Sequence, residues 1–268
     1  MTIAERLNAG LGRLEKHITA YDLFAIGVVA MGLGRLASTF EIDSDLLKIP
    51  LRALMPVFMV LIGYNVGRRF IDWRILGCAV IIIVARALLF NVWFWPSLGH
   101  FPLNFLVTIV VTRAIIEPLM AFAMKTRVHF WLTVLALAAA APWTHIHLME
   151  YGTLGVLMAM CGWLARNRAQ LPSGAVDVRD FFIIVLFFYL AFCQAIYAFS
   201  PPSFVAMAAG TALVFRFCYN FRVLLLASLK RKPKDLVERA CYFMGRNSLE
   251  IYTLMVIVSY LAFYRAIA

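Results

Sequence analysis

The sequence has few acidic residues and almost no long polar stretch. Only 14 of its 268 residues are Asp or Glu, against 25 Lys or Arg, whereas 63% of the residues are hydrophobic. A soluble globule of this size would have too few polar side chains to cover its surface. The composition therefore excludes an ordinary soluble domain and predicts that the lipid bilayer is the solvent for most of the chain.

Cysteine is also scarce, and the five cysteines lie in or beside apolar segments without paired spacing. This pattern is typical of small buried hydrophobic residues and argues against a disulfide framework or a zinc site. The sequence also lacks a glycine-rich phosphate loop, an HExxH motif and a CxxCH haem-attachment motif. His145 and His147 flank Ile146. Two histidines are too few for a metal site, and we expect them to be exposed to solvent in an outer loop.

Nine apolar segments dominate the sequence. A helix needs roughly 20 mostly apolar residues to cross about 30 Å of hydrocarbon, and it satisfies its own backbone hydrogen bonds there. The segments are continuously hydrophobic, whereas the strands of a membrane barrel would alternate. We therefore predict an all-α fold, a polytopic transmembrane helical bundle with about nine spans, of which the fifth and sixth are short. The expected spans are residues 20–40, 50–66, 75–95, 102–123, 129–141, 149–165, 180–200, 203–219 and 248–268.

The basic residues occur almost entirely in alternate gaps between these segments. Lys and Arg accumulate on the cytoplasmic side of membrane helices, so the alternation predicts a cytoplasmic N-terminus and an outer C-terminus. The opposite gaps contain Lys48 as their basic residue. The net charge of +11 is then a signal of topology, and we do not expect a nucleic-acid partner. The basic gaps contain Arg6, Arg13, Lys16, Arg68, Arg69, Arg74, Lys125, Arg127, Arg166, Arg168, Arg179, Arg216, Arg222, Lys230, Arg231, Lys232, Lys234, Arg239 and Arg246.

Two parts of the chain differ from the spans. Residues 1–19 are charged, with Ile3, Leu7, Leu11 and Leu14 at helical spacing, and they lack the short apolar core and cleavage site of a signal peptide. We expect an amphipathic helix on the membrane surface, followed by a transmembrane domain over residues 20–268. The only sizeable polar insertion in that domain is a basic cytoplasmic loop at about residues 220–247.

A few ionisable residues fall inside the expected spans, where an unpaired charge costs several kcal/mol. Arg113 and Glu117 are four residues apart and share a helical face, so we expect them to form a structural ion pair. Arg86 has no partner on its own segment. It is expected either to bind an anionic ligand or to pair with Glu117 or Glu250.

The basic loop contains a dense cluster of positive charge at Lys230, Arg231, Lys232 and Lys234. Each such charge attracts anionic lipid headgroups by roughly 1 kcal/mol. The same cluster is suited to contact the phosphates of a cytosolic nucleotide cofactor. Contact with lipid is the simpler interpretation.

Four sequence stretches together resemble one family. GRNSLEIY at residues 245–252 resembles the start of the last helix in integral-membrane acyltransferases. RALMPVFMVLIGYNVGRRF at residues 52–70, PLNFLVTI at 102–109 and EYGTLGVLM at 150–158 resemble, in this order, stretches of the TraX family of conjugation proteins. Each stretch is weak by itself, and their order and spacing carry the resemblance over much of the chain.

The resemblance implies transfer of an acetyl group from acetyl-CoA to the amino terminus of a pilin subunit. Members of the family usually carry an Asp-His pair in the first helix and a histidine shortly after the tyrosine of the last helix. This chain has Gly34 and Arg35 at the first place and Met255 at the second. Arg stays protonated and a thioether has no useful basicity, so neither replacement acts as a base. Loss of a general base typically costs about 100-fold to 10,000-fold in rate.

These departures lead to two main hypotheses of function. The first is a TraX-like membrane protein that is catalytically degenerate and serves as an accessory or structural subunit, bound to another membrane complex or to a pilin-like helix. The second is a working acyltransferase, with acetyl-CoA or another acyl donor as co-substrate and Glu250 as the candidate base. In that case the candidate contacts to acyl-CoA are Arg86, Arg113, Lys230, Arg231, Lys232 and Lys234.

A transporter or lipid-handling protein is a third alternative, although the sequence has no clear pair of discontinuous helices. No metal site and no cofactor beyond the acyl-CoA co-substrate is expected. The resemblance and the charge pattern together imply a multi-pass protein of the bacterial inner membrane, with the lipid bilayer and other membrane subunits as its partners.

Overall fold

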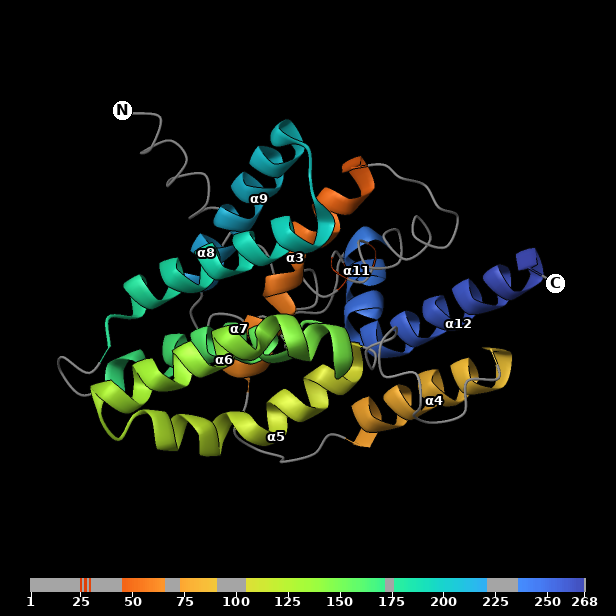
Figure 1. Cartoon of the computed structure of the whole chain (residues 1–268). Helices are drawn as coiled ribbons and strands as arrows, with labels where there is room; N and C mark the ends of the chain where they lie inside the picture. The colour runs from red at the N-terminus through yellow and green to blue at the C-terminus, as the bar shows by residue number, and fades with distance from the viewer. Residues whose placement is uncertain are drawn as a thin grey trace.

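The computed structural model describes residues 25, 27, 29, 45–65, 73–90, 105–171, 176–220 and 236–267. These residues form helices, with no β-strand among them, which confirms the all-α fold expected from the sequence. Figure 1 shows the arrangement. The helices are α3 (Asp45–Tyr64), α4 (Trp73–Phe90), α5 (Phe105–Ala123), α6 (Arg127–His147), α7 (Gly152–Asn167), the short 3₁₀ helix η1 (Arg168–Gln170), α8 (Val178–Tyr197), α9 (Pro201–Asn220), α11 (Leu236–Arg246) and α12 (Ser248–Ile267).

Three of these helices, α5, α8 and α9, are long and apolar enough to cross a membrane. Shorter apolar helical segments lie at Ile49–Tyr64 in α3 and Ser248–Ala262 in α12. The chain is therefore a helical membrane protein. Each expected span from residue 50 onward coincides with one helix, whereas the expected span at residues 20–40 lies almost entirely outside the described residues.

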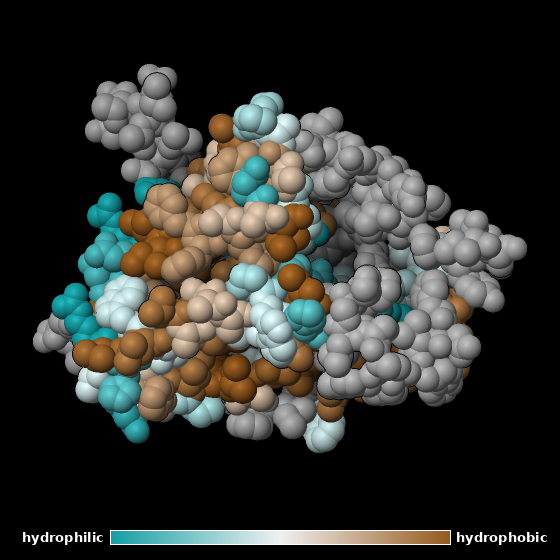
Figure 2. Space-filling model, viewed as in Figure 1, coloured by the Kyte–Doolittle hydropathy of each residue, from teal (hydrophilic) through white to brown (hydrophobic). Residues whose placement is uncertain are grey.

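Large apolar side chains cover much of the outer surface. Val128, Leu132 and Leu135 recur at helical spacing along α6, and each is at least 60% exposed; Phe187 on α8 is 66% exposed. Figure 2 shows apolar surface in brown over the region that α5, α6 and α8 occupy. In water such a surface would promote aggregation, whereas in lipid it is the exterior expected of a membrane protein.

Helix α7 forms the centre of the bundle and packs against α3, α5, α6, α8 and α9. The contact with α3 is unusually close because glycines face it from both sides. A Cβ atom added at Gly63 would lie 1.8 Å from the backbone oxygen of Ala159, and one added at Gly162 would lie 1.9 Å from that of Val60. Small residues allow helix backbones to approach in this way.

The turn between α6 and α7 differs from the sequence-based expectation. Helix α6 continues through Pro142 to His147, so it is longer than the expected span at residues 129–141. His145 is half-buried and its Nδ1 atom accepts a hydrogen bond of 3.0 Å from the backbone N–H of Tyr151. The expectation of exposed loop histidines was therefore wrong, because His145 and His147 both lie in the last turn of α6 and are partly buried. The last turn of α6 therefore packs against the start of α7.

The basic loop expected at residues 220–247 contains a helix, α11, in its last part. Leu236, Ala240 and Met244 recur every four residues there, which favours an amphipathic helix. The junction with α12 is tight, because the side-chain amide of Asn247 donates to the carbonyl oxygen of Phe243 at 2.9 Å. The backbone N–H of Ile251 donates to the carbonyl oxygen of Asn247 at 2.9 Å. Residues 221–235, which include the basic cluster, lie outside the described residues.

Candidate functional site

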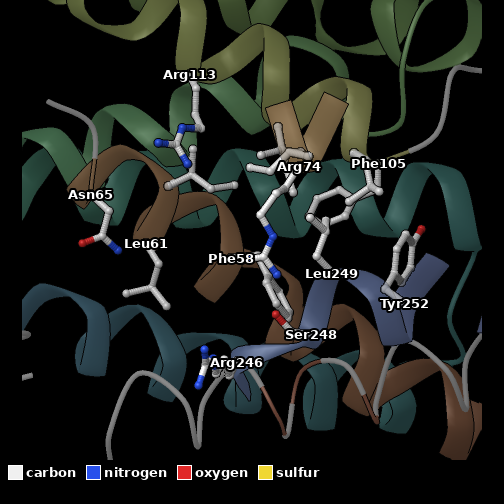
Figure 3. Close-up of a pocket in the computed structure, with 14 residues that line it drawn as sticks. Phe58, Leu61, Asn65, Arg74, Phe105, Arg113, Arg246, Ser248, Leu249 and Tyr252 are labelled. Atoms are coloured by element: carbon white, nitrogen blue, oxygen red, sulfur yellow. The ribbon is translucent and has the colours of Figure 1, made fainter. Parts of the chain in front are cut away.

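A cavity of about 220 Å³ lies where α3, α4, α5 and the junction of α11 with α12 meet. Figure 3 shows its side chains. We name it the arginine cavity. Its walls are formed by Phe58, Leu61, Ile62, Asn65, Arg74, Ile75, Phe105, Leu106, Ile109, Arg113, Arg246, Ser248, Leu249 and Tyr252.

One end of the arginine cavity is aromatic. The ring of Phe105 packs edge-on against Phe58, with 6.1 Å between centroids, and against Tyr252, with 6.3 Å. Phe58 and Phe105 are buried, at 5% and 2% exposure. Such edge-to-face pairs add roughly 0.5–1.5 kcal/mol each beyond their burial. This end of the cavity is therefore a fixed apolar wall.

The other end is polar and positively charged. Arg113 comes from the middle of α5, Arg246 is the last residue of α11 and Asn65 directly follows α3. Figure 3 shows these three side chains toward the left of the view, with Phe105 and Tyr252 toward the right. Three separate segments thus change from apolar to polar in the same direction along the cavity. A bound molecule would meet an apolar wall at one end and cationic donors at the other.

Arg74, in the first turn of α4, contributes a third guanidinium to the cavity. Its side chain also forms an ion pair with the carboxylate of Glu250, in the first turn of α12. The two side chains are 64% and 45% exposed, so solvent weakens this pair. Among the described residues, the lining includes three arginines and no Asp or Glu, which gives the site a positive field that attracts anions.

Of the predicted site residues that the structure describes, Arg113 lines the arginine cavity, whereas Arg86 and Glu250 do not. Arg113 lines the arginine cavity, as a contact to an anionic donor requires. Arg86 is half-buried on α4, about three turns from Arg74, and it is not among the cavity-lining residues. Glu250 is not among the lining residues, and its carboxylate pairs with Arg74, which is. Lys230, Arg231, Lys232 and Lys234 lie outside the described residues.

Of Arg35 and Met255, which stand where TraX proteins usually have histidines, the structure describes only Met255. Arg35 lies outside the described residues. Met255 is partly buried, packs against the hydrophobic core and is not among the residues that line the arginine cavity. Within the described part of the chain, the lining contains no His, Asp, Glu or Cys. Its arginines stay protonated, so they donate hydrogen bonds and do not accept a proton.

Arg113 and Glu117 each have a neighbour outside α5, and the ion pair expected from their spacing stays a prediction. Arg113 is directed into the cavity, whereas a carboxylate oxygen of Glu117 accepts a hydrogen bond of 3.3 Å from the indole N–H of Trp163 on α7. The i, i+4 spacing puts both residues on one side of α5 and does not decide where their long side chains point. Packing against α7 and the open space of the cavity decide it here.

Sequence reasoning missed Asn65, Arg74 and Arg246 as site residues. Arg74 and Arg246 were counted only as markers of the cytoplasmic side, and Asn65 only as part of a stretch that resembles TraX proteins. Each belongs to a different segment, and no local pattern joins them. The usable signal was that all three lie next to the ends of apolar segments on the same expected side of the membrane.

A second polar cluster surrounds Arg52 on α3. Its Nη1 atom donates to the hydroxyl of Tyr151, and its guanidinium carbon lies 4.0 Å from the ring centroid of Tyr197 on α8. The hydroxyl of Tyr189 donates to the backbone oxygen of Arg52 at 2.5 Å. These contacts tie α3 to the start of α7 and to α8. Phe105 lies between this cluster and the arginine cavity, because its ring also packs edge-on against Tyr151.

The chemistry of the arginine cavity is that of an anion-binding site with an apolar extension. The guanidinium groups of Arg113 and Arg246 and the amide of Asn65 lie at one end, and charge-assisted hydrogen bonds from guanidinium groups are among the stronger ones in proteins. Comparisons of the chain with protein-family models, with curated proteins and with solved structures found no match.

Proposed function

We propose that this protein is a TraX-like membrane protein that binds an anionic, apolar-tailed ligand in the arginine cavity and transfers no acyl group itself. The observation that carries the proposal is the convergence of Arg74, Arg113 and Arg246, from three segments, on one space with an aromatic far wall. In this proposal the protein is an accessory or structural subunit of a larger membrane complex.

The proposal includes the multi-pass arrangement inferred from charge, with about nine spans, a cytoplasmic N-terminus and a bacterial inner membrane. Asn65, Arg74 and Arg246 belong to segment ends that this arrangement assigns to the cytoplasmic side. Their proximity in the arginine cavity agrees with it. Arg113 lies further along α5, about 12 Å from Phe105 at 1.5 Å per residue.

The side chains near the cavity support binding over catalysis. A general base must reach the proton that it removes and be free to take it. Met255 has no basic group, and the carboxylate of Glu250 is paired with Arg74. The residues that resemble the TraX family then preserve the helix packing and the cavity, without the proton-transfer groups.

Binding is tested with dodecyl phosphate, which carries a phosphate on an apolar chain, added to the purified protein in nanodiscs. Arg113→Gln removes one cationic donor, and the loss of a hydrogen bond to a charged group costs about 1.5–3 kcal/mol, or roughly tenfold or more in affinity. Arg179→Gln, on the exposed start of α8, is the matched control and leaves the affinity unchanged. Equal affinity for dodecyl phosphate in all three proteins would refute ligand binding in the cavity.

The role as a subunit has a separate test. Mild solubilisation of native membranes, followed by purification through a tag on this chain, is expected to recover it with a larger membrane complex at fixed stoichiometry. Recovery of the chain by itself at every detergent concentration would contradict the accessory role and leave the binding result intact.

The alternative is an acetyl-CoA-dependent acyltransferase that acetylates a pilin-like amine. The observation in its favour is that Glu250, the candidate base, contacts Arg74 at the edge of the cavity. In this alternative Arg86, Arg113 and the basic cluster at Lys230, Arg231, Lys232 and Lys234 hold the acyl-CoA. Consumption of acetyl-CoA by the purified chain, abolished by Glu250→Gln, would overturn the non-catalytic proposal.

A further inference from the structure

We infer that the ligand of the arginine cavity is an anionic glycerophospholipid of the surrounding bilayer, and that α11 lies on the membrane surface beside it. The inference rests on the proposed binding function and names its ligand. The phosphate binds at the arginine end, and the nearest part of an acyl chain lies against the aromatic end.

Helix α11 has an exposed apolar surface. Leu236 is 83% exposed and Phe243 is 62% exposed, although the helix also carries Arg239 and Arg246. A short helix that combines exposed large apolar residues with charges is typical of one that lies in the interface between lipid and water. Figure 1 shows α11 lying across the direction in which α4 and α12 run beside each other.

Helix α11 leads directly into the wall of the arginine cavity. Arg246 ends α11, Ser248 begins α12, and both line the arginine cavity. If α11 lies in the interface, its last residue lies at the depth of lipid headgroups. Of the possible occupants of this surface, anionic lipid is favoured by the net charge of +11 on the chain.

The walls of the arginine cavity change in polarity along their length. From Phe58 to Asn65, from Phe105 to Arg113 and from Tyr252 back to Arg246, each wall changes from an aromatic ring to a polar side chain within about two turns of helix. A free inorganic anion would use only one end of this space. A molecule with a phosphate and a hydrocarbon chain uses both.

The volume of the arginine cavity suits part of a lipid better than a whole nucleotide. Pockets that enclose a drug-sized ligand measure roughly 300–1,000 Å³, and the arginine cavity measures about 220 Å³. A nucleotide-bearing thioester would remain mostly outside it. A phospholipid needs space only for its phosphate and the adjoining part of one chain, because the rest stays in the bilayer.

The test measures phosphatidylglycerol that stays bound to the full-length protein in native mass spectrometry, after purification in mixed micelles that also contain phosphatidylcholine. We expect preferential retention of phosphatidylglycerol, and a decrease in its affinity of about tenfold in Arg246→Gln and in Arg113→Gln. Arg239→Gln removes a charge from the same exposed helix without touching the cavity and is expected to change the affinity less than twofold. Because Arg246 is exposed, its variant is expected to fold even if the Arg113 variant does not.

Competition separates the possible sources of the anion. Inorganic phosphate is expected not to displace phosphatidylglycerol, and acetyl-CoA is expected not to compete. Displacement by phosphate, or tight binding of acetyl-CoA without retention of phosphatidylglycerol, would overturn the lipid assignment while the proposed anionic site stands. Failure of dodecyl phosphate, acetyl-CoA and phosphatidylglycerol to bind would overturn both.

The position of α11 has its own readout. Phe243→Trp in liposomes is expected to add fluorescence that brominated lipids quench, relative to the parent protein with its six tryptophans. Added fluorescence that brominated lipids leave unchanged would place this surface against protein or water and refute the interfacial helix.

Discussion

Arg74 and Glu250 form an ion pair across 176 residues of sequence. The pair joins the first turns of α4 and α12 at the edge of the arginine cavity. Because Arg74 also lines the cavity, the carboxylate of Glu250 competes with any bound anion for the same guanidinium.

Neutralising this carboxylate is expected to strengthen ligand binding. Glu250→Gln removes the carboxylate that competes with the ligand for Arg74, and we expect the affinity for dodecyl phosphate to rise about threefold. Little stability is lost, because an exposed ion pair contributes only about 0–1 kcal/mol. Isothermal titration in nanodiscs measures the change. Asp180→Asn, an exposed acidic residue on α8, serves as the control. A weaker affinity in Glu250→Gln would mean that the carboxylate helps to hold the ligand.

The aromatic wall is expected to be important for stability as well as for the shape of the cavity. Phe105 is 2% exposed and packs against Phe58, Tyr151 and Tyr252. Phe105→Ala leaves a void and is expected to lower the free energy of unfolding by about 3–5 kcal/mol. Thermal unfolding in detergent checks this.

The matched control for this substitution is Phe187→Ala on α8, where the side chain is 66% exposed. A lipid-facing ring is surrounded by hydrocarbon in both states, so its loss is expected to change the midpoint temperature little. Equal losses in the two variants would contradict the assignment of Phe105 to the inside and Phe187 to the lipid side.

The glycine contact between α3 and α7 is expected to tolerate no methyl group. Gly162→Ala puts a Cβ against the backbone of Val60, which cannot move as a flexible side chain does. We expect a loss of at least about 1–3 kcal/mol, the usual cost of overpacking. Gly77→Ala on α4 meets nothing within 4 Å and is expected to be neutral or to stabilise by up to about 1 kcal/mol. Thermal unfolding of the two variants, measured side by side, distinguishes these outcomes.

His145 is expected to make the fold sensitive to acid. Burial, and secondarily the charge of Arg52, lowers the pKa of His145 below its ordinary value of 6.5. The neutral ring accepts the backbone N–H of Tyr151 through Nδ1, and a proton on that atom would break the bond. Since the unfolded chain binds the proton more readily than the folded one, stability is complete above pH 6.5 and decreases as the pH falls through that value.

The measurement compares midpoint temperatures at pH 7.5 and pH 5. His145→Asn keeps an acceptor at a similar position and does not titrate, so its midpoint is expected to change less between the two pH values than that of the parent protein. The same pH dependence in both proteins would assign the acid sensitivity to another group.

The positions of most helices followed from hydrophobic runs. The expected spans at residues 180–200 and 203–219 match α8 and α9 closely, because a long apolar segment in a membrane protein has few options other than a helix. The ends of the helices were less predictable than their positions. Helix α6 runs through Pro142, and α11 forms inside a stretch that its charge marked as a loop.

The site was much less predictable than the helices. Arg113 was proposed as a contact to an anionic donor and lines the arginine cavity, while Arg74 and Arg246, which also line it, were interpreted as signals of topology alone. Arg86 was a better candidate by sequence, because it is the more isolated charge in an apolar run, yet it does not line the cavity. Local spacing gives the face of a helix, and it does not give the rotation of one helix against another.

The sequence by itself determined that this protein is helical and belongs in a membrane. Hydrophobicity and backbone hydrogen bonding are local properties, so composition and periodicity are enough to predict them. Only the tertiary structure decided that Arg74, Arg113 and Arg246 share one cavity with an aromatic end. Their shared position depends on long-range packing, which fixes where each helix presents its side chains. One example is the close approach of α3 and α7, where Gly63 faces Ala159 and Gly162 faces Val60.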